Sequence, residues 1–109
     1  MRQQGFSRHS LSGNLDHRIP LYLWETEGEP EAIVQIFHGL GEHAARYDRF
    51  AAAATARGFA VCAHDHRGHG PDASEAGFYA ESLGWQLLVD DGHRVTDFLR
   101  DRFHRQPVV

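Results

Sequence analysis

Two apolar runs, residues 32–37 and residues 60–64, constrain the fold of this chain more than any other feature. The first run does not alternate cleanly between apolar and polar side chains, which is typical of a strand that is covered on both faces. Each run ends abruptly in a polar turn that is rich in glycine. Residues 46–57 lie between the runs and place apolar side chains at helical spacing, and Gly58 follows as a stop signal. The pattern therefore predicts a β-α-β unit with two parallel strands.

The remaining segments add an antiparallel strand pair and one long helix. Residues 6–11 and 19–24 are short strand-like segments joined by a turn that contains Gly and Asn, so we expect them to pair. Residues 85–103 form the longest predicted helix, and Gly92 in its interior weakens it by about 1 kcal/mol relative to alanine. Residues 106–109 resemble the opening of a further strand.

Periodicity also predicts which side chains of these elements face a core. In the helix 46–57 they are Tyr47, Phe50, Ala51 and Ala54. In the helix 85–103 they are Leu88, Val95, Leu99 and Phe103. In the strand 19–24, one face carries Leu21 and Leu23 and the other carries Tyr22 and Trp24.

The topology brings the two polar turns together. Parallel strands that are joined by a helix cross over right-handed and end on the same edge of the sheet. Open α/β sheets bind their ligands at that edge, outside the carboxyl ends of the strands. The turns after residues 37 and 64 are therefore the predicted functional region.

Composition excludes several classes of function. A chain of 109 residues with 41% apolar residues suits one small domain over residues 1–109. A net charge of −4, with the basic residues spread along the chain, does not favour nucleic-acid binding. No segment approaches the roughly 18 apolar residues of a membrane span, so we expect a protein that is not transmembrane. The single Cys62 lies within an apolar run and predicts a core residue in a reducing, cytoplasmic setting.

The turn after the first run has the features of an oxyanion hole. Glycines let a backbone turn sharply and leave an N–H group free to point at a developing negative charge. The candidate donor is the backbone N–H of Leu40, and an ordinary glycine turn after a strand is the structural alternative. The residues that would shape or brace this loop are His38, Gly39, Gly41, Glu42 and His43.

The two turns together resemble those of a known family. HGLGEH followed by Arg46 and Tyr47, then a helix, then HDHRGHG, is similar to the α/β-hydrolase branch of monoacylglycerol lipases, lysophospholipases and serine aminopeptidase-like hydrolases. The resemblance implies an α/β fold, the N-terminal part of an α/β-hydrolase with an incomplete sheet. It also implies that Leu40 supplies an oxyanion N–H and that the second turn supports the floor of the active site. The floor residues are Asp65, His66, Gly68, His69 and Gly70.

The resemblance further implies a serine hydrolase of acyl esters, such as monoacylglycerols or lysophospholipids, without a cofactor or metal. In the family the nucleophile follows a later strand in a G-H-S-x-G elbow, and these 109 residues contain no G-x-S-x-G. The acid and the catalytic His of the triad are likewise expected later. We therefore expect an N-terminal, truncated piece of a hydrolase that is inactive alone. This chain also has Gly70-Pro71-Asp72 where the family usually has Ser two residues after the turn, which leaves the role of that loop open.

Two further functions remain open. The strand 32–37 would lack a neighbour at one edge, so the chain would self-associate or dock onto a complementing hydrolase half that carries the nucleophile. Alternatively, His64, His66 and His69 form H-x-H-x-x-H, which resembles a zinc motif of metallo-β-lactamase type. That motif has Asp before its last His, where this chain has Gly68, so hydrogen bonding within a tight loop is the other interpretation of these histidines.

Overall fold

The computed structural model describes residues 5–13, 18–37, 47–65 and 84–109. The strands are β1 (Ser7–Ser12), β2 (Arg18–Trp24), β3 (Ala32–Phe37) and β4 (Phe59–His64), and the helices are α1 (Asp48–Ala56) and α2 (Gly84–Arg102). The bounds of β3 coincide with the expected range, and the other elements begin and end within two residues of theirs. Differences of this size are common at frayed element ends.

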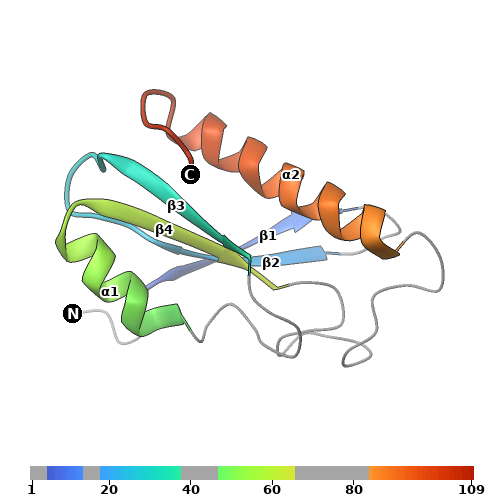
Figure 1. The fold of residues 1–109 in the computed structure, drawn as a ribbon, viewed down its shortest axis with the longest axis horizontal. Coiled ribbons are helices and arrows are strands. Elements are labelled where there is room, and N and C mark those ends of the chain that lie inside the picture. Colours follow the sequence, from blue (N-terminus) through green and yellow to red (C-terminus); the bar gives the residue numbers. More distant parts are fainter. Residues whose placement is uncertain (1–4, 14–17, 38–46, 66–83) are drawn as a thin grey trace.

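The four strands form one mixed sheet in the order β1-β2-β4-β3 (Figure 1). β1 pairs with β2 and β2 with β4 in antiparallel fashion, whereas β3 and β4 are parallel. α1 connects the two parallel strands, as expected for a β-α-β unit. The predicted fold class is therefore confirmed.

The two helices cover opposite faces of the sheet (Figure 1). Alternation along β2 divides its side chains between the two faces as expected, and each face has its own core cluster. The α2 side contains Ile19, Leu21, Leu23, Ile33, Ala60, Cys62, Val95 and Leu99. The α1 side contains Tyr22, Trp24, Ala51, Val61 and Ala63. The indole N–H of Trp24 also donates to Asp48 Oδ1 at 2.7 Å, which ties β2 to the first turn of α1.

Two of the expected core positions on the helices are wrong. Phe50 is 51% exposed, because α1 packs on the sheet through Ala51 and turns its larger side chain outward. In α2, Leu87 is buried rather than Leu88. Leu87 lies two helical turns before Val95 and three before Leu99, so these three side chains share the face that packs on the sheet.

The end of α1 depends on a glycine. Gly58 has a φ of +95°, in the left-handed region that side chains with a Cβ rarely adopt. Its N–H donates to the carbonyl of Thr55 at 3.1 Å, and the N–H of Arg57 donates to that of Ala54 at 3.0 Å. The predicted stop signal is therefore the point where the chain leaves α1 and enters β4.

The outer edge of β3 is partly covered, which corrects the expectation of an open edge. Ile33 forms a parallel bridge with Val108. The N–H of Ile33 donates to Pro107 O at 2.9 Å, the N–H of Val109 donates to Ile33 O at 2.9 Å, and the N–H of Gln35 donates to Val109 O at 2.8 Å. The predicted strand opening in residues 106–109 thus lies beside the first half of β3.

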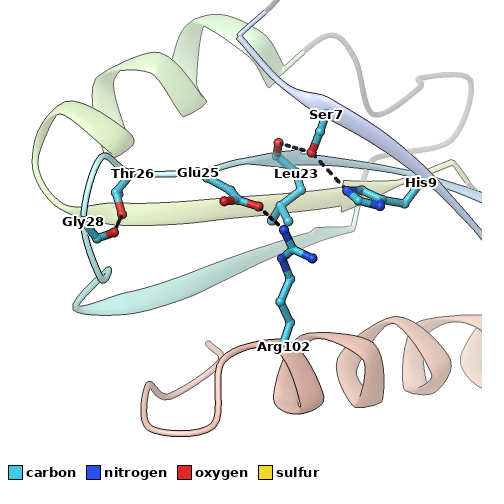
Figure 2. Close-up of polar contacts among 7 residues, drawn as sticks. All are labelled: Ser7, His9, Leu23, Glu25, Thr26, Gly28 and Arg102. Atoms are coloured by element: carbon cyan, nitrogen blue, oxygen red, sulfur yellow. Dashed lines mark hydrogen bonds and ion pairs between the residues drawn. The ribbon is translucent and has the colours of Figure 1, made fainter.

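An exposed ion pair joins the end of α2 to the end of β2. Figure 2 shows Arg102 reaching from α2 to Glu25, with Nη2 and Oε2 2.6 Å apart. Both side chains are about two-fifths exposed, so the pair adds little to stability. In β1, the hydroxyl of Ser7 contacts the ring of His9 and donates to the carbonyl of Leu23 in β2 (Figure 2). The second contact supports the pairing of β1 with β2.

Candidate active site

The carboxyl ends of β3 and β4 lie side by side. Their parallel register pairs Phe37, the last residue of β3, with His64, the last residue of β4. The two polar segments singled out in the sequence therefore leave the sheet from neighbouring positions, as the topology predicted. This edge is the place where open α/β sheets bind ligands.

Asp65 is held inside the protein directly after β4. It is fully buried, and the hydroxyl of Tyr22 donates to its Oδ2 at 2.9 Å. Its backbone N–H donates to the carbonyl of Pro20 at 3.0 Å. These two contacts attach the start of the second turn to β2. Of the predicted floor residues, Asp65 is the one in the described ranges, and its position is set by the core.

His64 and Phe37 meet across the two strand ends. His64 is fully buried, and its ring packs edge-on against Phe37 with centroids 5.3 Å apart and an interplanar angle of 84°. Phe37 itself is 55% exposed. An exposed aromatic side chain at the carboxyl end of β3 is one feature of this edge that could not be predicted from the sequence, because an apolar run does not show which of its side chains is exposed.

Tyr22 is a second residue that the sequence reasoning missed. Alternation placed it on the face opposite Leu21 and Leu23, which is correct. Its hydroxyl signals a buried polar partner, because tyrosine hydroxyls usually find one in a core. The sequence carries no sign that this partner is Asp65, 43 positions along the chain.

Cys62 is buried in the core on the α2 side of the sheet. Burial raises the pKa of its thiol from the ordinary 9.0 to about 12. Because the thiolate is the reactive form of cysteine, burial disfavours nucleophilic chemistry at this residue near neutral pH. Its predicted role as a small core residue is consistent with this position.

The described ranges hold no group of three or more His, Cys, Asp or Glu side chains that is arranged to bind a metal. His64 lies in these ranges, whereas His66 and His69 of the alternative zinc motif lie outside them. Within the same ranges, neither helix is both long and apolar enough to cross a membrane.

The remaining site predictions fall outside the described residues. They concern the proposed oxyanion loop and most of the second turn. These residues are His38, Gly39, Leu40, Gly41, Glu42, His43, His66, Gly68, His69 and Gly70.

An apolar groove of about 350 Å³ lies beside α1 at the outer part of the sheet. Val34 of β3, Phe50 and Ala54 of α1, Phe59 of β4 and Val109 line it. Phe50 and Val109 are 51% and 71% exposed, so the groove presents apolar side chains to solvent. It lies on the α1 side of β3, next to the backbone edge that residues 107–109 begin to cover.

Comparison with known proteins agrees with this geometry. Residues 28–109 match the family described as serine aminopeptidase, S33. A monoacylglycerol lipase of Mycolicibacterium smegmatis is 42% identical over 64 residues, which are 59% of this chain and 23% of that lipase. Protein K6 of vaccinia virus is 37% identical over 68 residues, which are 62% of this chain and 72% of that protein.

The fold also matches solved structures. A thermostable carboxyl esterase from Bacillus coagulans, determined in complex with glycerol, superposes with a TM-score of 0.82 and 26% identity. The match covers 95% of this chain and 34% of the esterase. The chain therefore spans about a third of this esterase and about a quarter of the Mycolicibacterium lipase.

Proposed function

The chain belongs to the serine aminopeptidase S33 family of α/β-hydrolases, and on this premise we propose that it forms one side of the active site of an ester hydrolase. The observation that carries the proposal is the register of β3 and β4. Because Phe37 pairs with His64, the proposed oxyanion loop and the proposed floor begin at adjacent points of the sheet.

In this proposal the backbone N–H of Leu40 stabilises the oxyanion of a tetrahedral intermediate. Preorganised N–H donors of this kind act on charge that develops only during the reaction. Tyr22 supports the floor by holding Asp65 at the end of β4. The nucleophilic serine, its base and the second N–H donor come from outside these 109 residues, because a lone oxyanion donor forms no covalent intermediate.

The proposed substrates are acyl esters such as monoacylglycerols and lysophospholipids. Support comes from the relatives, which include a monoacylglycerol lipase and, among the structures, a carboxyl esterase. The buried, unpaired thiol of Cys62 is compatible with action in the cytoplasm.

A second candidate function is docking onto a hydrolase half that carries the nucleophile. The apolar groove between Val34, Phe50 and Val109 favours it, since exposed apolar surfaces often mark places where another chain packs. In this case the chain completes a site rather than forming one.

Labelling with a fluorophosphonate probe, which reacts with activated serines, tests the proposal. We expect the 109-residue chain alone to remain unlabelled and to leave 4-nitrophenyl butyrate unhydrolysed. We expect activity in a hybrid esterase in which this chain replaces the structurally equivalent third of the Bacillus coagulans esterase.

Each outcome separates the candidates. Labelling of the chain alone would place a nucleophile within these residues and contradict the proposal. Labelling that appears when the chain is mixed with the remainder of the esterase as a separate polypeptide would favour the docking function. A folded hybrid that neither reacts with the probe nor hydrolyses the ester would contradict both.

A further inference from the structure

Gly92, in the interior of α2, lies against the ring of Phe37. A Cβ placed on Gly92 would lie 2.6 Å from Cε2 and 2.9 Å from Cζ of that ring, closer than real Cβ atoms come to a neighbour. Gly92 does not have the positive φ that Gly5 and Gly58 have. Backbone conformation therefore gives no reason for a glycine here, and helix propensity disfavours one. The feature that requires glycine is the approach of Phe37.

Polar contacts at Gly92 and Thr96 join the same two elements. Gln35 Nε2 donates to the carbonyl of Gly92 at 3.3 Å. The Thr96 hydroxyl lies 2.7 Å from Gln35 Oε1 and 3.0 Å from the Gly92 carbonyl, so its single proton bonds one of two nearby acceptors. Gln35 and Phe37 lie on the same face of β3, because side chains two positions apart share a face. Both therefore meet α2 within the last three residues of the strand.

The ring of Phe37 also contacts His64. Phe37 packs edge-on against His64 at 5.3 Å, so the ring contacts the end of β4 as well as Gly92. With 55% of its surface exposed, Phe37 gains less from burial than a core residue does. Its position depends on these specific contacts rather than on general apolar packing.

We propose that Gly92 is a positioning residue. Because Gly92 has no side chain, the ring of Phe37 packs closely against α2. This packing, here called the seat of Phe37, sets the direction in which the chain leaves β3. The inference rests on the proposed function, because the residues that follow Phe37 include the oxyanion donor Leu40. Gln35 and Thr96 belong to the same seat, which connects α2 to the active-site edge of the sheet.

Gly92→Ala tests the seat in the 109-residue chain. The added methyl group forces the far end of the Phe37 ring to move, while alanine improves helix propensity. We expect the ring C–H signals of His64 in NMR spectra to shift, because the neighbouring aromatic ring has moved, and the thermal midpoint to stay equal or rise. His93→Ala is the matched control, since it improves propensity at the next, exposed position of α2. It should leave the His64 signals in place.

The effect on positioning is measured in the hybrid esterase. We expect Gly92→Ala to lower kcat on the order of 10-fold to 100-fold with KM nearly unchanged, because a small misplacement of a catalytic group has an effect of this size. Thr96→Val removes the hydroxyl without adding volume, and should lower kcat in the same way even if Gly92→Ala does not fold. Gly28→Ala, where an added Cβ meets nothing within 4 Å, should leave kcat unchanged.

The proposal is overturned if Gly92→Ala changes the His64 signals no more than His93→Ala does. It is equally overturned if Gly92→Ala and Thr96→Val both leave kcat at the value of the control variants. A hybrid that is inactive with Gly92 in place contradicts the proposed function instead, and the His64 signals in the 109-residue chain then decide whether Gly92 seats the ring.

Discussion

Cys62 shows how a single buried side chain makes stability depend on pH. In the folded protein the pKa of its thiol is raised from 9.0 to about 12 by burial. Between these values the unfolded chain has lost the proton and the folded chain has kept it, so stability falls as pH rises. Below pH 9.0 both states hold the proton and this contribution is fully present. We expect urea unfolding to show a decline in stability from pH 9.0 to about 12.

Cys62→Ala provides the comparison that isolates this effect. Other groups that titrate at high pH are shared by the two proteins, so the difference between their unfolding free energies reports on the thiol alone. Equal pH slopes for the parent and Cys62→Ala over this range would show that the thiol ionises in the folded protein as readily as in the unfolded one.

The buried hydrogen bond between Tyr22 and Asp65 holds the first residue after β4 in place. Tyr22→Phe removes the hydroxyl that donates to Oδ2 at 2.9 Å while keeping the ring. Removing one partner of a buried hydrogen bond costs about 1–3 kcal/mol, so we expect a loss of that order in the free energy of unfolding. The loss is measured by urea denaturation.

A double-mutant cycle with Asp65→Asn separates the bond from general effects of each change. Because the two side chains are in contact, we expect that the losses from Tyr22→Phe and Asp65→Asn do not add in the double variant. Additive losses would mean that the two side chains stabilise the protein independently.

At the scale of elements, the strands could be predicted better than the faces of the helices. β3 was predicted with its observed bounds, because a strand covered on both faces has an apolar run that begins and ends sharply. α1 was placed correctly along the chain, but Phe50 was assigned to the core and is 51% exposed. A short helix rich in alanine has small side chains on several faces, so periodicity alone does not show which face contacts the sheet.

Residues 107–109 hydrogen-bond along the edge of β3, where the sequence predicted an open edge. Val109→Pro removes the N–H that donates to Ile33 O at 2.9 Å. Losing one backbone hydrogen bond lowers the free energy of unfolding by about 1 kcal/mol and uncovers more of the β3 edge. We expect a lower thermal midpoint and earlier aggregation by light scattering.

Val109→Ala is the matched control, since it shortens the same exposed side chain and retains the N–H. It should behave like the parent protein in both measurements. If Val109→Ala and Val109→Pro have the same effect, the side chain rather than the backbone bond supports this edge.

At the scale of the whole molecule, the sequence predicted the arrangement of the two parallel strands better than the contacts at their ends. The β-α-β pattern predicted that the two parallel strands end side by side, and the pairing of Phe37 with His64 confirms this. The contacts between Gln35, Gly92 and Thr96 could not be predicted, because they join residues about sixty positions apart and depend on how α2 packs. The sequence contained one sign of these contacts, which is the glycine at position 92, because glycine is disfavoured in the interior of a helix.

The effect of a single oxyanion donor is measurable only within a complete active site. An oxyanion hole lowers the barrier of a reaction that a nucleophile has begun, so its contribution appears only in a complete active site. The hybrid esterase provides a complete active site. In it, the kcat values of variants at one position can be compared while the nucleophile, the base and the substrate stay the same.

The most direct test of the central claim is the kcat of Leu40→Pro and Leu40→Ala in the hybrid esterase with 4-nitrophenyl butyrate as substrate. Proline removes the backbone N–H, and alanine keeps it while shortening the side chain. Removal of one oxyanion donor typically lowers kcat by about 10²–10³. We predict a loss of this size for Leu40→Pro and a kcat near the parent value for Leu40→Ala, with both proteins folded. Equal kcat values for the two variants would contradict the assignment of Leu40 as an oxyanion donor.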